Sequence, residues 1–271
     1  MSAWPSDEQL AGAERLLRVP AANGAGRRSE GAADFFDTGV NGRQRFVPPL
    51  LAERLHREGP VAVGSTALYT YSGGAYRPHG EERLRRRIAE LLGDRWRRNA
   101  ADETIAFLRD SSPGLWECPP RNRINCANGI LDLGTGRLER HDPEFLSPVQ
   151  IAASYDRRAI CPQIEKFLGE VLATELLPIV YELVGYLITP DNSLQRAFMF
   201  LGRGANGKST LLNLVVALLG PQNVSAIPLH KLDEDRFASA ELYGKLANVF
   251  ADWTRGRSAP RRCSRRLPAA T

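Results

Sequence analysis

The chain has 271 residues, 43% of them apolar, so it can hold one large domain or two small ones around a true hydrophobic core. Its formal charge of +5 does not by itself indicate nucleic-acid binding. Residues 253–271 contain six of the 36 basic residues and no acid, so residues 1–252 hold 30 basic against 31 acidic residues and a formal charge of −1. The four cysteines show no C-x-x-C spacing, which argues against a zinc site or a disulfide framework and favours a reducing, cytoplasmic setting.

The N-terminal residues 1–33 are expected to be a flexible segment. They begin with an acidic stretch that has no apolar run, so no signal peptide is visible. Residues 8–19 have the pattern of one short helix, and residues 20–33 are small, polar and rich in glycine, as in a linker. No part of the chain approaches the roughly 20 apolar residues that a membrane span requires, so no membrane partner is expected.

A mixed α+β region is predicted from residue 34 to 185. A helix is expected over 46–56, opened by prolines, with three leucines on one side: Leu50, Leu51 and Leu55. A second, amphipathic helix is expected over 81–98, with Trp96 continuing its apolar stripe. Between them, residues 67–78 predict a β-hairpin that turns at Ser72-Gly73-Gly74.

The polar face of the predicted helix 81–98 is rich in arginine. It carries Arg83, Arg85, Arg86, Arg87, Arg95, Arg97 and Arg98. One interpretation is a contact with a DNA backbone, and the other is a solvated face, because four acidic residues are interleaved with the arginines. The interleaving favours the solvated face.

The rest of this region predicts a second hairpin and two helices. The hairpin spans 124–139, with turns at Asn128-Gly129 and Gly134-Thr135-Gly136. A further strand is expected within 147–156. Apolar helices are expected over 164–172 and 176–188, the second stopped by Pro190.

A phosphate-binding pattern follows the second apolar helix. Residues 197–201 predict a strand buried on both faces, Gly202-x-x-x-x-Gly207-Lys208-Ser209 follows, and 209–219 predicts an apolar helix. The glycines allow a tight turn whose N–H groups approach phosphate oxygens, and the helix N-terminus favours the same anion. Lys208 would contact the β- and γ-phosphates of ATP, and Ser209 would bind Mg²⁺. The alternative, a glycine-rich surface turn, explains the flanking strand and helix less well.

A second part of this site is expected about 44 residues further along. The sequence predicts a strand over 224–227, a short helix over 235–243 and a buried strand over 246–251, which delivers Asp252 at its carboxyl end. An acid in this position is typical of the Walker-B role, in which the carboxylate holds Mg²⁺ and helps to polarise the attacking water. Lys208 and Asp252 are therefore the predicted catalytic residues, and Ser209 and Asp252 are the predicted metal ligands.

These residues resemble a known family. Gly202-Arg203-Gly204-Ala205-Asn206-Gly207-Lys208-Ser209-Thr210 is similar to the Walker A motif of superfamily III helicases, and more closely to that of the phage and plasmid primase–helicase family that includes the poxvirus primase–helicase. Three further stretches fit that family: 128–133 with 155–162, 185–190, and 241–252. The resemblance covers residues 34–252.

The resemblance implies an α/β P-loop NTPase motor over 186–252, behind a mixed collar domain over 34–185. It implies ATP hydrolysis coupled to the unwinding of single-stranded or forked DNA during phage or plasmid replication, with Mg²⁺ as cofactor and a homo-oligomeric ring. Residues 202–210 would bind the nucleotide. Residues 1–33 are too few for the primase domain that such proteins often carry.

The family's motor continues past its Walker-B acid to a polar sensor and an arginine finger, whereas only residues 253–271 follow Asp252 here. This tail has no apolar periodicity. It has two interpretations, a basic arm that binds nucleic acid or the product of a shifted reading frame, and the abrupt change in composition favours the second. A chain cut off in this way is expected to bind nucleotide but to hydrolyse it poorly.

Two other functions stay open. The chain could be a non-catalytic nucleotide-binding relic, or a partner that interferes with a full-length helicase. It could also be another P-loop ATPase or kinase, although the guanine-reading Asn-Lys-x-Asp motif of GTPases does not occur.

Overall fold

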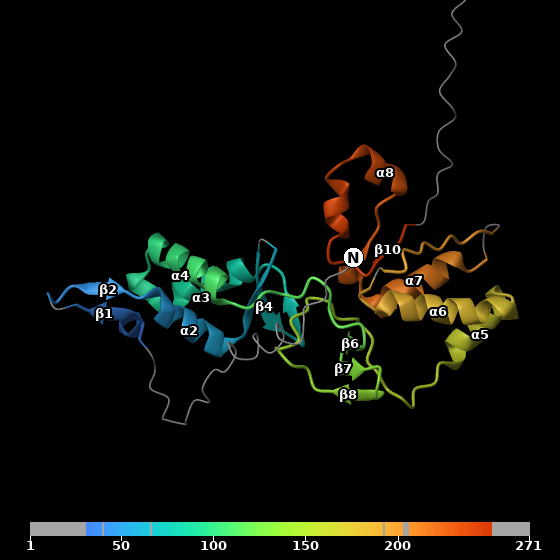
Figure 1. Ribbon diagram of the computed structural model, residues 1–271, viewed down its shortest axis with the longest axis horizontal. Coiled ribbons are helices and arrows are strands. Elements are labelled where there is room, and N and C mark those ends of the chain that lie inside the picture. The colour runs from blue at the N-terminus through green and yellow to red at the C-terminus, as the bar shows by residue number, and fades with distance from the viewer. Residues whose placement is uncertain (1–30, 40, 66, 192, 203–205, 251–271) are drawn as a thin grey trace, which may run out of the picture.

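The computed structural model describes residues 31–39, 41–65, 67–191, 193–202 and 206–250. The molecule is elongated: three helices near the N-terminus lie at one end, a small antiparallel sheet lies in the middle, and the C-terminal helices lie at the other end (Figure 1). Buried apolar side chains form three separate clusters along this axis. The expected helix 8–19 lies outside the described residues.

The N-terminal unit is built from three helices that pack on one another and on a three-stranded sheet. The helices are α2 (Pro48–Glu58), α3 (Gly80–Leu92) and α4 (Arg98–Ser111). Its apolar cluster includes Leu51, Leu68, Ile88 and Leu108, none of which is exposed to solvent. Burying one such side chain contributes about 2 kcal/mol. A short element η1 (Ala32–Phe35) and the antiparallel pair β1 (Phe36–Thr38) and β2 (Gln44–Phe46) extend the unit.

Two predictions in this unit need correction. The helix expected over 46–56 is confirmed as α2, but Leu50 is exposed while Leu51 and Leu55 are buried. The helix expected over 81–98 is confirmed over 81–92 and wrong over 93–98, because Gly93 adopts a positive φ of 48° and ends α3. Trp96 therefore lies outside the apolar stripe and is exposed. The separate helix α4 was not predicted.

The first sheet has the strand order β3-β4-β5. The predicted hairpin is confirmed as β4 (Ala67–Ser72) and β5 (Ala75–Arg77), and β3 (Val61–Gly64) adds an antiparallel strand. Gly73 and Gly74 make the turn with φ of 61° and 86°, values that favour glycine. The second predicted hairpin is also confirmed, as the antiparallel sheet β6 (Arg123–Cys126), β7 (Gly129–Asp132) and β8 (Arg137–Glu139).

The strand expected within 147–156 does not form. Residues 145–153, hereafter the strap, instead run between the two sheets and the C-terminal helices. Their backbone bonds go to several segments rather than to one partner: Trp116 N–H donates to Leu146 O (2.9 Å), Ile151 N–H to Asn125 O (2.9 Å), and Ala152 N–H to Leu218 O (3.1 Å). A strand requires one continuous neighbour, which the strap lacks among the described residues.

The C-terminal helices agree with the predicted pattern. They are α5 (Pro162–Val171), η3 (Thr174–Leu176) with α6 (Leu177–Ile188), and α7 (Lys208–Leu219). Within the described ranges no single helix has the length and apolar character to cross a membrane, although α5 and η3–α6 pass that test together across a 120° bend.

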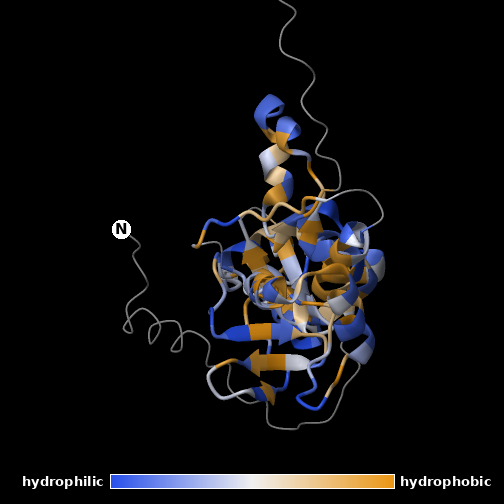
Figure 2. Ribbon diagram, turned by 90° about the vertical axis from the view of Figure 1, so that its right-hand side faces the viewer, coloured by the Kyte–Doolittle hydropathy of each residue, from blue (hydrophilic) through white to orange (hydrophobic). Residues whose placement is uncertain are grey.

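The segment after α7 forms a parallel pair of strands. It consists of η4 (Pro221–Asn223), β9 (Val224–Ser225), α8 (Leu229–Glu234), η5 (Ala238–Leu242) and β10 (Ala247–Asn248). The part that carries α8 projects from the body of the molecule (Figure 1 and Figure 2). The expected helix 235–243 is thus a 3₁₀ segment preceded by a separate helix. The fold is mixed α/β with small sheets.

Candidate functional site

The phosphate-binding pattern lies at the N-terminus of α7. Gly207 is the residue before the helix, with φ of 80°, and the first helical bond runs from Leu211 N–H to Gly207 O (2.9 Å). The first turn of α7 therefore directs its backbone N–H groups out of the N-terminal end of the helix. The positive end of the helix dipole adds to them, so this terminus is suited to an anion.

The two outer glycines of the pattern lie close to other side chains. A Cβ atom on Gly202 would lie 2.1 Å from Asn206 Nδ2. A Cβ atom on Gly207 would lie 2.7 Å from Val171 Cγ1, and its positive φ adds strain. The left-handed φ of Gly207 is the conformation that a tight turn directly before α7 requires, and it favours glycine.

The functional side chains of the pattern gather at this helix end. Lys208 Nζ donates to Gly202 O (3.0 Å) and to Asn206 Oδ1 (2.6 Å), so its ammonium group lies across the loop that precedes the helix. Ser209 and Thr210 lie in the first turn of α7, and both are exposed. Residues Arg203, Gly204 and Ala205 lie outside the described part of the chain.

The strand that was expected before the loop does not form, and this prediction was wrong. Residues 197–201 form no regular secondary structure, and Phe198, Met199 and Leu201 are exposed. A strand exists only by pairing with a neighbour. In the described part of the chain, β9 and β10 pair with each other and neither pairs with 197–201.

The strand that leads toward Asp252 forms in its first half. β10 pairs in parallel with β9, and two further bonds extend the ladder, from Leu246 N–H to Asn223 O (2.8 Å) and from Val249 N–H to Ser225 O (2.8 Å). Helix α7 covers this pair, because Val215 and Leu219 belong to the same apolar cluster as Leu246. Asp252 itself lies outside the described residues, so its Walker-B role remains a prediction.

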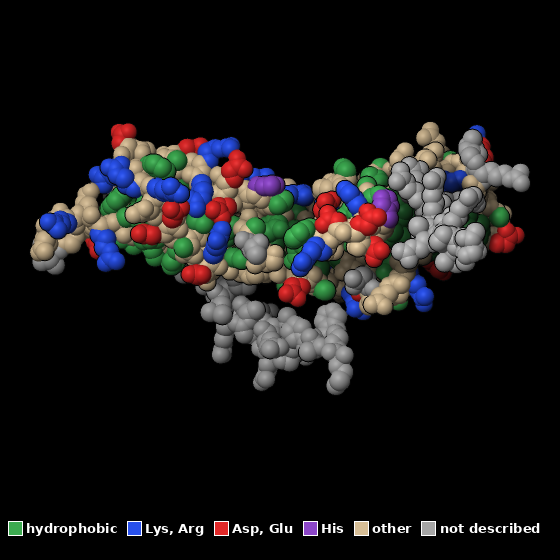
Figure 3. Space-filling model, turned by 90° about the horizontal axis from the view of Figure 1, so that it is seen from above, with side chains coloured by type: hydrophobic (Ala, Val, Ile, Leu, Met, Phe, Trp, Pro, Cys, Tyr) green, Lys and Arg blue, Asp and Glu red, His purple; other side chains and the backbone are tan. Residues whose placement is uncertain are grey.

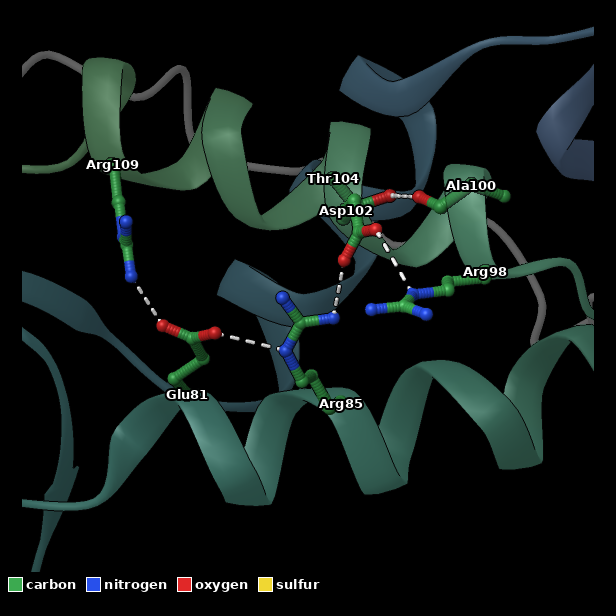
Figure 4. A network of polar contacts seen from close by, with 7 residues as sticks. All are labelled: Glu81, Arg85, Arg98, Ala100, Asp102, Thr104 and Arg109. Carbon is green, nitrogen blue, oxygen red and sulfur yellow. Dashed lines mark hydrogen bonds and ion pairs between the residues drawn. The ribbon is translucent and has the colours of Figure 1, made fainter.

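The arginine-rich face of α3 is engaged in ion pairs (Figure 4). Arg85 contacts Glu81 (2.9 Å) and Asp102 (2.7 Å), and Glu81 also accepts a bond from Arg109. Arg87 binds Glu58 (2.7 Å), and Figure 3 shows basic and acidic side chains interspersed over this end of the molecule. The hydrogen bond from Arg85 lowers the pKa of Glu81. These contacts support the interpretation as a solvated, internally paired face.

An open pocket was not foreseen from the sequence. It has a volume of about 490 Å³ and lies at the carboxyl end of β9, lined by residues 224–228 and by three charged side chains: Lys231, Glu241 and Lys245. The carboxyl ends of parallel strands are where α/β sheets bind ligands, but strand pairing between β9 and β10 could not be read from two-residue strands.

Two family models match parts of the chain, and neither covers half of it. Residues 62–173 match the family described as "D5 N terminal like", and residues 200–267 match a family of unknown function, DUF5906. No curated protein matches the chain. The first domain is found in phage and viral primase–helicase proteins, which agrees with the family resemblance of the sequence. The second match includes the phosphate-binding pattern, Asp252 and most of the tail.

The first match points to a replication protein related to primase–helicases.

Proposed function

We propose that this chain binds ATP with Mg²⁺ at the N-terminus of α7, as the nucleotide-binding part of a primase–helicase-related replication protein. The observation that carries the proposal is the joint placement of Gly202, Gly207 and Lys208. Gly207 takes a left-handed φ directly before a twelve-residue helix, and the ammonium group of Lys208 binds back to Gly202 O at the same helix N-terminus. A glycine-rich surface turn would not need a lysine whose ammonium group binds back to Gly202 O and Asn206 Oδ1.

The residues of this chain have separate roles in the proposal. The loop amides and Lys208 would hold the phosphates, and the Ser209 hydroxyl together with Asp252 would hold Mg²⁺. Bound ATP supplies a phosphoanhydride whose γ-phosphoryl group can be transferred to water. DNA is the proposed partner of the activity, in keeping with the family of the first match.

Equilibrium binding of fluorescent ATP, with and without Mg²⁺, tests this function. Lys208→Ala should weaken binding by on the order of 100-fold, because a charge-assisted contact to phosphate contributes several kcal/mol when partly buried. Lys166→Ala is the matched control, since Lys166 lies on α5 and pairs with Glu170 (3.8 Å). Equal binding by Lys208→Ala and the wild type would refute the proposal.

Steady-state phosphate release separates the remaining alternatives. A chain that binds ATP but releases no phosphate would be a non-catalytic binder, and inhibition of an intact relative's unwinding activity would then identify an interfering partner. Phosphate transfer to a small molecule rather than to water would instead indicate a kinase.

A further inference from the structure

Gln150, on the strap of residues 145–153, is a buried polar side chain that reaches three parts of the molecule. It is only 7% exposed. Its Nε2 donates to Gly73 O in the β4–β5 turn (2.8 Å), and its Oε1 accepts a bond from Arg77 on β5. The same Nε2 lies 3.4 Å from Cys126 O at the end of β6. One side chain thus joins the first sheet to the second.

Asn223 is a second buried polar side chain, and it joins the C-terminal elements to the strap. It is 4% exposed, and its Nδ2 donates to Leu219 O, the last carbonyl of α7 (2.7 Å), and to Gln150 O (2.7 Å). Its own carbonyl accepts the bond from Leu246 N–H, directly before β10. The residue therefore holds the end of α7, the start of β10 and the strap at one point.

These contacts form a continuous chain between distant elements. α7 carries the candidate phosphate site at its other end, about 18 Å away for a helix of twelve residues, and β10 leads toward Asp252. Both are fixed by Asn223, Asn223 is bonded to Gln150, and Gln150 is bonded to the β4–β5 turn. Buried polar groups are costly when one partner is removed, so the connection is energetically significant.

We propose that Gln150 and Asn223 are positioning residues, a coupling node through which nucleotide binding at α7 stabilises the β4–β5 hairpin of the N-terminal unit. The node rests on the proposed function, because it needs a ligand at α7. A ligand that binds only the folded state of its site makes every local unfolding event that disrupts that site less favourable. An opening of the hairpin that breaks the node also releases α7 and β10, so the ligand opposes that opening.

Hydrogen exchange of the full chain tests the node. The reporter is the amide of Tyr76, which donates to Ser147 O on the strap (3.3 Å). With ATP and Mg²⁺ at 100 times the dissociation constant, exchange in the wild type should slow by about tenfold or more, within the roughly 100-fold limit that this saturation allows. In Asn223→Ala the slowing at Tyr76 should disappear even when ATP is raised to about 100 times the dissociation constant of that variant, so that both proteins are equally saturated.

Two other variants separate coupling from general loss of stability. Asn248→Ala is the matched control: it removes an asparagine whose amide makes two 2.8 Å bonds to the Ile227 backbone but does not touch the strap. It should keep the slowing at Tyr76. Gln150→Ala removes the side-chain bond to Gly73 O but keeps the main-chain carbonyl of residue 150, which accepts the bond from Asn223. ATP should no longer slow exchange at Tyr76 in this variant. It therefore tests the node even if Asn223→Ala does not fold.

The failures of the two proposals are distinguishable. If ATP slows exchange at α7 but not at Tyr76 in the wild type, or if Asn223→Ala retains the slowing at Tyr76, the node is refuted while nucleotide binding stands.

If ATP does not bind, the proposed function fails, and the node is tested without ligand by hydrogen exchange in mild denaturant. In the wild type, the amides of α7 and of the β4–β5 hairpin should then exchange through one shared opening. In Asn223→Ala, the two elements should open separately. Separate openings in the wild type would overturn the node.

Discussion

The two ends of the molecule are built differently. In the N-terminal unit the large apolar side chains are mostly buried in one cluster, and the arginines of α3 pair with carboxylates of the same unit. In the C-terminal half many large apolar side chains are exposed, among them Tyr181, Phe198, Met199, Leu201, Phe237 and Tyr243. The buried face of α7 depends partly on the second sheet, through Ile124 and Leu131.

This difference shows where each region obtains its stability. The N-terminal unit buries most of its large apolar side chains in its own core, and the arginines of α3 pair with its own carboxylates. The candidate nucleotide-binding half does not, because α7 needs the second sheet and residues 197–201 find no strand partner in the described part of the chain.

The sharpest test of this contrast compares leucines at the two ends. Leu51→Ala in the N-terminal cluster should lower the free energy of unfolding by about 2–5 kcal/mol, because it leaves a cavity in a close-packed core. Leu201→Ala, at a side chain that is 82% exposed, should change it by less than about 0.5 kcal/mol. Urea unfolding measures both. Similar losses at the two sites would contradict the contrast.

A glycine on α3 tests the close packing of the same unit. A Cβ atom on Gly80 would lie 2.5 Å from Leu68 O, a backbone atom that cannot turn away. Gly80→Ala should therefore destabilise the chain by roughly 1–3 kcal/mol, as overpacked sites do. Gly59→Ala is the control, since a methyl group added there would meet no atom within 4 Å and the φ of Gly59 is extended. Equal unfolding midpoints for the two variants would show that the contact is loose.

The ion pairs of α3 should contribute less than its packing. Arg85→Gln removes contacts to Glu81 and Asp102, both at partly exposed positions, and should cost about 0.2–1 kcal/mol. The loss should shrink in NaCl at about 1 M because salt screens exposed pairs. An unchanged loss at high salt would argue against an electrostatic cause. A clear drop in DNA affinity for this variant would favour the DNA-contact interpretation that the pairing disfavours.

The smallest expected effect is a dependence on pH from His56. Burial lowers the pKa of this histidine below its ordinary value of 6.5. Below pH 6.5 the unfolded chain binds a proton that the folded chain resists, so stability should fall as the pH drops from 6.5 toward the folded pKa. Unfolding at about pH 7.5 and about pH 5.5 should show a smaller loss for His56→Gln than for the wild type. If the wild type and His56→Gln lose equal stability between these two pH values, the pH dependence comes from other titratable groups.

Local patterns in the sequence predicted the local structure well. Glycine-containing turn motifs located both hairpins, and apolar periodicity located α2, α5, α6 and α7. The predictions failed where structure depends on distant partners. The strand at 197–201 requires a neighbour that the sequence does not identify, and the strap has a strand-like composition but bonds to several segments. Helix α4 was missed, although Ala101, Ile105 and Leu108 follow a helical spacing.

The candidate site was predictable only in part. The spacing of Gly202, Gly207 and Lys208 located it, and the structure confirms the helix that starts at Lys208. Its connection to the N-terminal unit through Gln150 and Asn223 was not predictable, because isolated polar residues in a sequence do not reveal which buried partners they meet. The roles of Asp252 and of the tail remain predictions. The second family match extends through residue 267, which counts against a shifted reading frame.

The central claim is that the N-terminus of α7 binds the phosphates of ATP. Titration calorimetry with ATP and Mg²⁺ on the wild type and on Lys208→Ala tests it most directly. The account predicts one binding site in the wild type, and an affinity lower by on the order of 100-fold in Lys208→Ala, with Lys166→Ala unchanged. Absence of binding in the wild type, or equal affinities for the wild type and Lys208→Ala, would contradict it.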